Sequence, residues 1–523
     1  MVAGIYISSW RQRATARLFG LGSFWHSLFR HWLVVCLTTT NSSRELNDSR
    51  QYIPRFSLLD DAGCERLHHA SLEILRRTGV RVQEPEALHL LQEAGAHVSD
   101  GDLVKLPPAL TEWALRQAPS RLALCKRGSD EIAVELSGAN VSFGPGSDCP
   151  HYLDPKEGHR DFTVEDIAAC VRLCDALPQI GFVMSMGIPE GITPGSQYQL
   201  QYGLMLEHTE KPAVFVANDR ADCEAIAAMA SAAAGGMDAL RLNPTILLYS
   251  EPTTPLVHTR TATEKLLYMA QERLPVVHSP APMMGGTAPV TLAGGLALGN
   301  AEVLSSLVMH QLKSQGAPFV FGTGLHHLDL RTTISVYGAP EFQLARALVA
   351  DMARYYGLPS WGYSSCSDSH VMDGQAAADA AYQVRDALMM GIHLVHDVGY
   401  LEAGLTTSPE LIVFTAEMVD MHSRFMAGVD LSDEMLALEV IHEVGPGGDF
   451  IATEHTLRHY RDDWYPTLFE RRRYTHWESN GALTLEERLR DKTISIMESH
   501  QPAPLTDAVR DELAHIQREA QRA

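Results

Sequence analysis

Eight short runs of β-forming residues recur along this chain, and a longer stretch of helical character follows each run. Their spacing of roughly 30 to 45 residues suits a strand followed by a returning helix. This pattern predicts an α/β fold, a (β/α)8 TIM barrel over residues 139–410. The C-terminal strand ends of such a barrel carry its active site. The runs are Val141 to Gly144, Gly181 to Gly187, Ala213 to Asp219, Thr245 to Glu251, Pro275 to Pro280, Pro318 to Gly324, Pro359 to Cys366 and Leu394 to Gly399.

Residues 55–138 are predicted to form an N-terminal helical cap that ends in a hairpin. Asp60 or Asp61 can cap a first helix, which Gly79 ends. Prolines open two further helices. A polar turn at 128–130 then separates two segments of alternating polarity, as in a β-hairpin.

The two ends of the chain are predicted to lie outside the barrel. Residues 411–523 form a C-terminal helical extension, in which Thr484 and Glu487 have the spacing of a capping box. Residues 1–50 are interpreted as a leader or a disordered tail, because the first forty-four contain no Asp or Glu. An acid-poor, Arg-containing leader can also be a targeting segment. Its apolar run at 33–36 is too short for a membrane span, which needs about 20 residues.

Charge and cysteine content restrict the partners. The 64 acidic and 42 basic residues give a net charge of −22, which disfavours nucleic acid and anionic membranes, since both bind cationic surfaces. A small cation or another protein fits better. The eight cysteines lack a C-x-x-C pair, which favours reduced thiols and a cytoplasmic location. A homo-oligomer is left open.

Polar and aromatic side chains at the ends of the runs are the candidate site residues. Carboxylates beside aromatic faces suit a quaternary ammonium, which has no N–H to donate and is held by π-faces and electrostatic field. The run ends show neither a lysine placed for Schiff-base chemistry nor a phosphate-binding loop. The aromatic candidates are Phe143, Tyr249, Trp361, Tyr363 and Tyr400. The polar candidates at the mouth are Asp148, Asn218, Glu251, His278, His326, Asp329, Asp368, His370 and Glu402.

Two alternatives accompany these candidates. At least half of the aromatic residues can be core residues, because side chains alternate between the two faces of a strand. His326 and His327 with Asp329 could suggest a metal site, but adjacent residues on a strand point to opposite faces. We therefore expect no tightly bound metal.

Several motifs in the same order resemble the trimethylamine methyltransferase family. The resemblance extends from about residue 55 to the end of the chain. The motifs are Ser71 to Val80, Tyr337 to Glu341, Ser367 to Gln375, Gly399 to Thr406, Glu443 to Gly448 and Glu454 to His459.

The resemblance implies a barrel enzyme that passes a methyl group from a methylated amine to the cobalt of a corrinoid, which a separate small protein carries. Founding members of the family use pyrrolysine, in the region of the Ser367 to Gln375 loop. Only standard residues occur there in this chain, so it resembles the non-pyrrolysine branch, which includes glycine betaine methyltransferases. His370 stands where lysine is common in that branch.

The sequence therefore predicts a corrinoid-dependent methyltransferase acting on a betaine-like quaternary amine. Because a neutral tertiary amine leaves such a substrate, no general acid is required. We expect aromatic residues around the ammonium, Glu251 or Glu402 as field partners, and His326 or His370 at a substrate carboxylate. Two other functions stay open: a metal-dependent lyase or hydrolase using His326, and a protein that binds a quaternary amine without turning it over.

Overall fold

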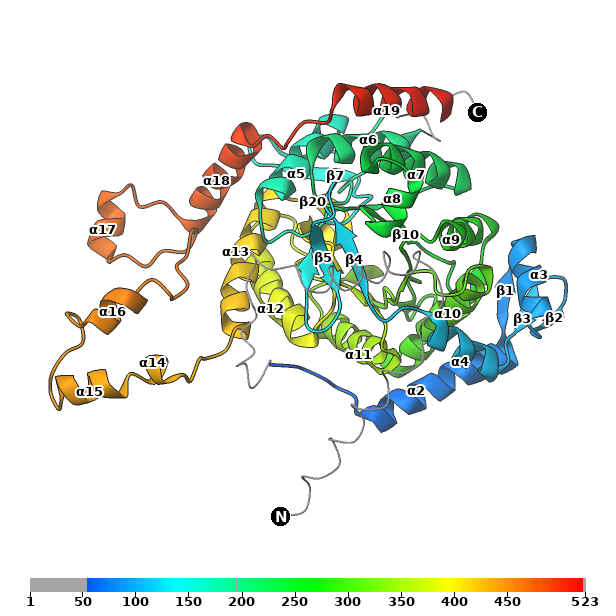
Figure 1. Ribbon diagram of the computed structural model, residues 1–523, viewed down its shortest axis with the longest axis horizontal. Helices are drawn as coiled ribbons and strands as arrows, with labels where there is room; N and C mark the ends of the chain where they lie inside the picture. The colour runs from blue at the N-terminus through cyan, green and yellow to red at the C-terminus, as the bar shows by residue number, and fades with distance from the viewer. Residues whose placement is uncertain (1–53, 193–195, 521–523) are drawn as a thin grey trace, which may run out of the picture. The chain divides into compact units, whose positions relative to one another are not determined.

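The computed structural model of this protein describes residues 54–192 and 196–520 (Figure 1). The predicted leader or tail, residues 1–50, lies outside the described residues. Residues 429–436, with the short helix α14 (Asp433–Leu436), belong to a separate unit. The remaining described residues form one unit of mixed α/β structure, as the sequence indicates.

The N-terminal region contains three helices, as predicted. Asp60 caps the first helix by accepting a hydrogen bond from the backbone N–H of Gly63, and a π-turn, η1 (Ile74–Thr78), leads to Gly79 at φ +80°. A side chain at Gly79 would meet the Val104 carbonyl oxygen at 2.4 Å, so both backbone conformation and space favour glycine. The helices are α2 (Asp61–Glu73), α3 (Pro85–Glu93) and α4 (Pro108–Gln117).

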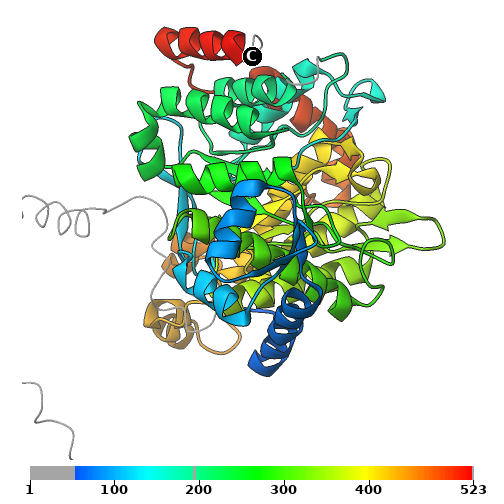
Figure 2. The same cartoon turned by 90° about the vertical axis from the view of Figure 1, so that its right-hand side faces the viewer.

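Two small sheets complete this region. The predicted hairpin is present as an antiparallel pair, β4 with β5. The other sheet, in the order β11, β1, β3, β2, was not predicted; its strands are too short to show a clear alternation. In Figure 2 this region (blue) lies in front of the green helices, and α2, α3 and α4 all contact α10. The strands are β1 (Val80–Val82), β2 (His97–Ser99), β3 (Leu103–Lys105), β4 (Leu122–Cys125), β5 (Ile132–Leu136) and β11 (Val257–His258).

Seven of the eight predicted runs contain a strand, and all of these strands pair in parallel. One sheet has the order β14, β12, β10, β9, and another has the order β17, β18, β6. The run at 181–187 forms no strand of its own but pairs in parallel through single bridges, such as Val183 with Ala213. The strands are β6 (Ser142–Phe143), β9 (Ala213–Phe215), β10 (Ile246–Ser250), β12 (Val276–His278), β14 (Phe319–Val320), β17 (Trp361–Tyr363) and β18 (Leu394–His396).

Parallel bridges also join the two sheets to each other. Phe143 at the end of one sheet pairs with Ile180, and Phe321 beyond β14 pairs with Ser360 before β17. Each run therefore has a parallel partner on both sides.

A helix follows each of the eight runs, and these helices lie around the outside of the strands in Figure 1. Parallel strands need such crossover connections. At the start of α5, Thr163 and Asp166 form a capping box. The helices are α5 (Val164–Ala176), α6 (Gln197–His208), α7 (Arg220–Ala234), α9 (Arg260–Glu272), α10 (Leu292–Lys313), α11 (Pro340–Tyr356), α12 (Gly374–Met390) and α13 (Pro409–Met426), with the shorter α8 (Met237–Leu242) after α7.

Helix α10 is the one described helix that is long and apolar enough to cross a membrane by length and composition. Of its most apolar window, 83% is buried inside the protein. It contacts α2, α4, α9 and α11, so it packs as the core helix of a globular domain does.

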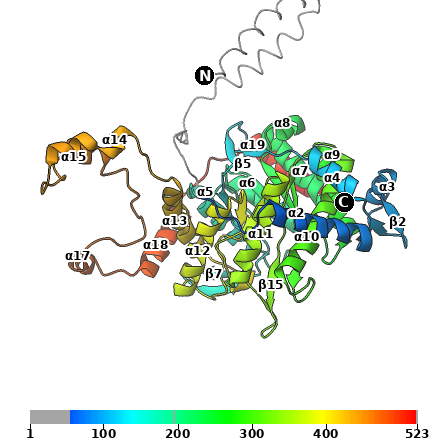
Figure 3. The same cartoon turned by 90° about the horizontal axis from the view of Figure 1, so that it is seen from below.

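Short strands and loops stand at the C-terminal ends of the parallel strands. β7 pairs with β8 and with β20, which in turn pairs with β19. β15 and β16 form an antiparallel hairpin, and Figure 3 shows it extending beyond the neighbouring helices. The elements are β7 (His151–Asp154), β8 (Gly158–Asp161), β13 (Met283–Met284), β15 (His326–Asp329), β16 (Ile334–Val336), β19 (Tyr400–Leu401), η2 (Glu402–Gly404) and β20 (Thr406–Thr407).

The C-terminal residues are helical, as predicted. Thr484 and Glu487 form a capping box at the start of α18, which packs on α13 and α5, while α19 packs on α7. None of the residues of α15, α16 or α17 is buried. The helices are α15 (Leu438–Val444), α16 (Glu454–His459), α17 (Tyr474–Ser479), α18 (Leu485–Ser499) and α19 (Asp507–Ala520).

Asp351 on α11 ties the segment before α2 to the rest of the unit. Its buried carboxylate accepts hydrogen bonds from the Ser57 hydroxyl at 2.8 Å, from the backbone N–H groups of Leu58 and Leu59 at 2.8 and 2.9 Å, and from Arg354 at 2.7 Å. Removing such an acceptor leaves several donors unpaired.

We expect Asp351→Ala to lower the free energy of unfolding by about 3 kcal/mol, the usual cost of breaking a buried charged network. Chemical denaturation measures this change. The matched control is Asp238→Ala, which removes a carboxylate that is 99% exposed and paired only with Arg241; it should leave the unfolding midpoint unchanged. Equal midpoints for the two variants would contradict the anchoring role of Asp351.

Candidate active site

The loops that follow the parallel strands contain unusual backbone conformations. Asp148, Met186, Ser365 and Asp397 have φ values of +69°, +66°, +57° and +68°. Asp148 follows the first run, and the other three stand near the C-terminal ends of the second, seventh and eighth runs. Non-glycine residues rarely adopt this left-handed conformation, and such strain persists mainly where function requires it. The backbone therefore marks the C-terminal strand ends as the candidate site.

Four rings from three strands form what we call the aromatic cluster: Tyr249 on β10, Trp361 and Tyr363 on β17, and His396 on β18. The centroid of the His396 ring lies 4.2 Å from that of Trp361 and 4.1 Å from that of Tyr363. Tyr249 lies 5.5 Å from Trp361 and 5.6 Å from His396. Trp361 and Tyr363 face the same side because side chains two apart on a strand do so.

A second group of rings adjoins Tyr363. His326 lies 5.7 Å from each of the rings of Tyr363, Tyr337 and Phe342, and Tyr337 lies 4.9 Å from Phe342. Burial and the nearby Arg346 lower the pKa of His326 to about 3. This imidazole is therefore neutral at physiological pH.

Two neighbouring carboxyl groups, Glu251 and Asp148, adjoin the aromatic cluster through Glu251. Glu251 accepts a hydrogen bond from the Tyr249 hydroxyl, and Asp148 accepts hydrogen bonds from Ser147 at 3.0 Å and Tyr198 at 3.5 Å. Glu251 is exposed, yet desolvation raises its pKa, and Asp148 raises it further. Both observations fit a carboxylate in a concave mouth, where water reaches the group but protein surrounds it. Desolvation also raises the pKa of Asp148.

His396 and Asp397 form a buried pair at the end of β18. His396 Nδ1 lies 2.8 Å from the Gly362 carbonyl oxygen, so Nδ1 carries the proton and Nε2 is an acceptor. Asp397 Oδ1 lies 3.3 Å from Nε2. Burial raises the pKa of Asp397 to about 7, while it lowers that of His396 to about 3. A protonated Asp397 can thus donate to a neutral His396.

Sequence reasoning missed two cations near the site. The Lys265 ammonium, from α9, donates to the Ala217 carbonyl oxygen at 2.6 Å, and burial lowers its pKa. Arg346, from α11, stacks its guanidinium over the rings of Phe342 and Tyr363, each 4.5 Å from the guanidinium carbon. Both residues stand on helices, whereas the sequence search followed strand ends. The spacing of Phe342 and Arg346, i and i+4, was the available signal.

The structure brings together five of the predicted site residues: Tyr249, Glu251, His326, Trp361 and Tyr363. Tyr400 is buried in the same hydrophobic cluster as Trp361, and its hydroxyl donates to the Ser147 carbonyl, next to Asp148.

The remaining three predicted site residues lie elsewhere. Phe143 is fully buried in the larger hydrophobic cluster that the strands share with the helices, because its position on β6 points away from the aromatic cluster. The His370 side chain is 78% exposed, and its Nδ1 atom stands 3.8 Å from the Glu402 carboxylate. Glu402 also lies 3.6 Å from His159 Nε2 and accepts a hydrogen bond from the Thr406 hydroxyl at 2.7 Å. Glu402 and His370 thus form a separate surface pair.

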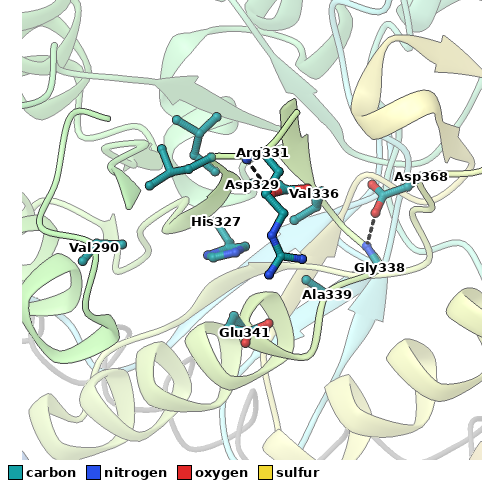
Figure 4. A pocket seen from close by; sticks show the side chains of 11 residues that line it. Val290, His327, Asp329, Arg331, Val336, Gly338, Ala339, Glu341 and Asp368 are labelled. Atoms are coloured by element: carbon teal, nitrogen blue, oxygen red, sulfur yellow. Dashed lines mark hydrogen bonds between the residues drawn. The ribbon is translucent and has the colours of Figure 1, made fainter. Parts of the chain in front are cut away.

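A pocket of about 610 Å³ lies beside the β15–β16 hairpin (Figure 4). His327, Asp329, Glu341 and Asp368 contribute to its lining. Asp329 accepts a hydrogen bond from the Arg331 N–H at 2.9 Å, and Asp368 accepts one from the Gly338 N–H, also at 2.9 Å. These two carboxylates therefore stabilise the backbone at Arg331 and Gly338. His326 and His327 belong to different sites, as alternation on a strand requires.

The described cysteines are free and buried. Burial raises the pKa of the Cys149 and Cys366 thiols, which belong to the same hydrophobic cluster as Trp361. Neither thiol is ionised at physiological pH, so neither is an activated nucleophile.

Comparisons with known proteins identify a family and several relatives. A family model described as trimethylamine methyltransferase (MTTB) matches residues 37–523. The trimethylamine methyltransferase MttB of Desulfitobacterium hafniense (strain DSM 10664 / DCB-2) is 32% identical over 457 residues, which are 87% of this chain and 92% of that protein.

Two further similarities are more distant. The glycine betaine methyltransferase of Desulfitobacterium hafniense (strain Y51) is 26% identical over 458 residues, which are 87% of this chain and 95% of that protein. The crystal structure of the Methanosarcina barkeri monomethylamine methyltransferase (MtmB) aligns with a TM-score of 0.47 and 11% identity, covering 90% of this chain and 89% of that one.

The family match spans most of the chain, and standard residues occupy the Ser367 to Gln375 loop. The chain therefore belongs to the trimethylamine methyltransferase family, in its non-pyrrolysine branch, and is a methyltransferase.

Proposed function

We propose that the protein is a (β/α)8 barrel enzyme that transfers a methyl group from a betaine-like quaternary amine to a corrinoid carried by a partner protein. The barrel is supported by the parallel partner that each of the eight runs has on both sides. The domain boundaries at residues 55, 139 and 411, and a cytoplasmic location, belong to the same proposal.

The aromatic cluster next to Glu251 is the observation that carries the proposed substrate class. Tyr249, Trp361 and Tyr363 offer π-faces from adjacent positions, and Tyr249 holds the Glu251 carboxylate by a hydrogen bond. A quaternary ammonium is attracted to ring faces and to negative charge, and it makes no hydrogen bond of its own. Glu402, which pairs with His370, and Phe143, in the larger hydrophobic cluster, are left out of the proposed site.

The residues at this site bind and orient a substrate rather than move a proton to it. The leaving group of a quaternary amine is a neutral tertiary amine, so no protonation is needed. Buried rings exclude water around the methyl group, and a fixed orientation toward the acceptor lowers the barrier through proximity. A corrinoid supplies the cobalt nucleophile when its carrier protein docks. Exposure of Glu251 leaves one side of the cluster open to such an approach.

Two observations weigh against the other candidate functions. A metal-dependent lyase or hydrolase would need His326 to bind the metal together with nearby acids, but His326 lies among the rings of Tyr337, Phe342 and Tyr363, and its charged neighbour is the cation Arg346. A protein that only binds amines is disfavoured by the family match over residues 37–523.

Demethylation of a panel of quaternary amines tests the proposed function. The purified protein is mixed with a cob(I)-loaded corrinoid protein and glycine betaine, carnitine or proline betaine, and the methylated corrinoid is followed by its absorbance. We expect methylation with at least one betaine and stoichiometric release of the tertiary amine. A second enzyme known to use the same corrinoid protein verifies that the acceptor is competent. If none of the amines then methylated the corrinoid, the proposal would be refuted.

The role of Tyr249 can be tested by binding alone. Tyr249→Leu removes the π-face and should weaken tetramethylammonium binding about tenfold, the size of a desolvated cation–π contact. Tyr249→Phe keeps the ring and should bind almost as well as the parent. Calorimetry measures both affinities.

The matched control is Tyr474→Leu, because Tyr474 is 67% exposed on α17. If Tyr249→Leu bound tetramethylammonium as tightly as Tyr474→Leu, the aromatic cluster would not be the ammonium site.

A further inference from the structure

Arg346 is a buried cation without a counterion. Only 1% of the residue is exposed. One terminal nitrogen donates to the Leu325 carbonyl oxygen, but Nε and the other terminal nitrogen, Nη1, have no hydrogen-bond partner among the described residues. Nor does any described carboxylate lie within ion-pair distance of the guanidinium.

The surroundings of Arg346 do not compensate for this burial. The rings of Phe342 and Tyr363 attract the cation, but a π-face satisfies no N–H in the guanidinium plane. Buried charges are normally paired, because an uncompensated charge in a medium of low dielectric constant is strongly destabilising. Two unpaired donors in one buried guanidinium therefore indicate a missing anion.

Asp397 is the nearest candidate for that anion within the chain, and its environment keeps it from that role. Its carboxyl interacts with Tyr337, whose hydroxyl donates to Oδ2 at 3.3 Å, and with His396 Nε2. Burial raises its pKa to about 7 in spite of the nearby Arg346. Asp397 is thus about half protonated near pH 7 and largely neutral below it.

We propose that Arg346 binds the carboxylate of the methyl donor, so that the pocket accepts a zwitterion and discriminates against quaternary amines that lack an anionic group. This inference rests on the proposed function and assigns a residue to the second end of its substrate. Nη2 donates one N–H to Leu325 and carries a second N–H. Together with the unpaired Nη1 or the unpaired Nε, this second N–H can hold a carboxylate in a bidentate geometry.

The two ends of the pocket are suitably arranged for such a substrate. Tyr363 contacts the Arg346 guanidinium with its ring, while its hydroxyl interacts with that of Tyr249, which holds Glu251. Arg346 therefore neighbours the ring of Tyr363, and Glu251 lies toward its hydroxyl end. A betaine, with its ammonium and its carboxylate a few bonds apart, complements a cation and a carboxylate that share this neighbour.

His326, the residue first expected at the substrate carboxylate, is a neighbour of Arg346 rather than its substitute. The guanidinium contributes to the low pKa of His326, so the imidazole carries no charge with which to attract an anion. Its ring packs against Tyr337 and against Phe342 and Tyr363, and the Arg346 guanidinium lies over the latter two rings.

Binding measurements on Arg346 variants test this inference without a corrinoid. We expect Arg346→Met to weaken glycine betaine binding about 10- to 100-fold, the range for a lost hydrogen-bonded charge, and to leave tetramethylammonium binding unchanged. Arg346→Lys keeps the charge without the bidentate geometry and should bind betaine with intermediate affinity. The control Arg331→Gln removes an exposed charge from the β15–β16 hairpin and should change neither affinity.

The two ligands distinguish failure of this inference from failure of the proposed function. If the parent protein binds neither compound, the proposed ammonium site fails, and the role of Arg346 fails with it. If Arg346→Met binds both compounds like the parent, only the role of Arg346 is refuted. Unchanged tetramethylammonium binding also shows that the variant pocket is folded, and a parallel loss of both ligands would mean that Arg346 is structural.

The pH dependence of betaine binding gives a second test. As pH rises through 7, Asp397 ionises and competes with the ligand carboxylate for Arg346, so betaine affinity should fall, by up to about tenfold per pH unit. Asp397→Asn should remove this fall. The titratable groups that face Arg346 and Asp397 are Tyr363, Cys366, Tyr337, His326, His396, Glu251, Cys149, Asp148 and Tyr400.

Most of these groups keep one charge state between pH 6 and 8. Burial raises the pKa of the tyrosines and cysteines and lowers that of His326 and His396 to about 3. Glu251 and Asp148 lie toward the proposed ammonium end. Tetramethylammonium has no carboxylate, so the pH dependence of its binding reports the ionisation of these two groups separately. A betaine affinity that stays constant or rises from pH 6 to 8 in the parent would refute the competition for Arg346.

Discussion

The two-residue period of the parallel strands is the constraint on which the site depends. On β10, Leu247 and Tyr249 face one buried cluster, while Leu248 between them faces the helices. The same alternation places Trp361 and Tyr363 together on β17. A shift of one residue in any of these strands would exchange the two sets of side chains, so hydrophobic burial fixes the positions of the rings before any ligand is bound.

Burial then determines the charge states at the strand ends. The desolvation that makes a carboxylate costly also keeps His326 and His396 neutral and raises the pKa of Asp397 to about 7. Burial therefore keeps the two histidines from accepting a proton at physiological pH, while Arg346 stays charged. Compared with the pair of half-buried Glu402 and exposed His370, these groups interact in a medium where each charge has a larger effect.

Local patterns in the sequence predicted the features of the fold that depend on residues close to one another along the chain, such as strands and helix caps. Strands in seven of the eight runs, the Asp60 cap and the two capping boxes follow from rules that span a few residues, and they are present in the structure. Failures occurred where distant segments decide. Phe143 was predicted at the site because its run ends nearby, but the pairing of β6 with β18 turns its ring outward. Arg346 reaches the site from a helix, so no strand-end rule could identify it.

The chemistry of the proposed reaction explains why a site can contain so many titratable groups and use none as an acid. A quaternary nitrogen has no lone pair to protonate, and its departure as a neutral amine removes positive charge from the pocket. Water near the ammonium would screen its attraction to Glu251 and the rings, whereas neutral histidines and buried tyrosines hold the pocket dry without competing charges. The unpaired guanidinium is then a buried charge in this region that an anion bound beside it would compensate.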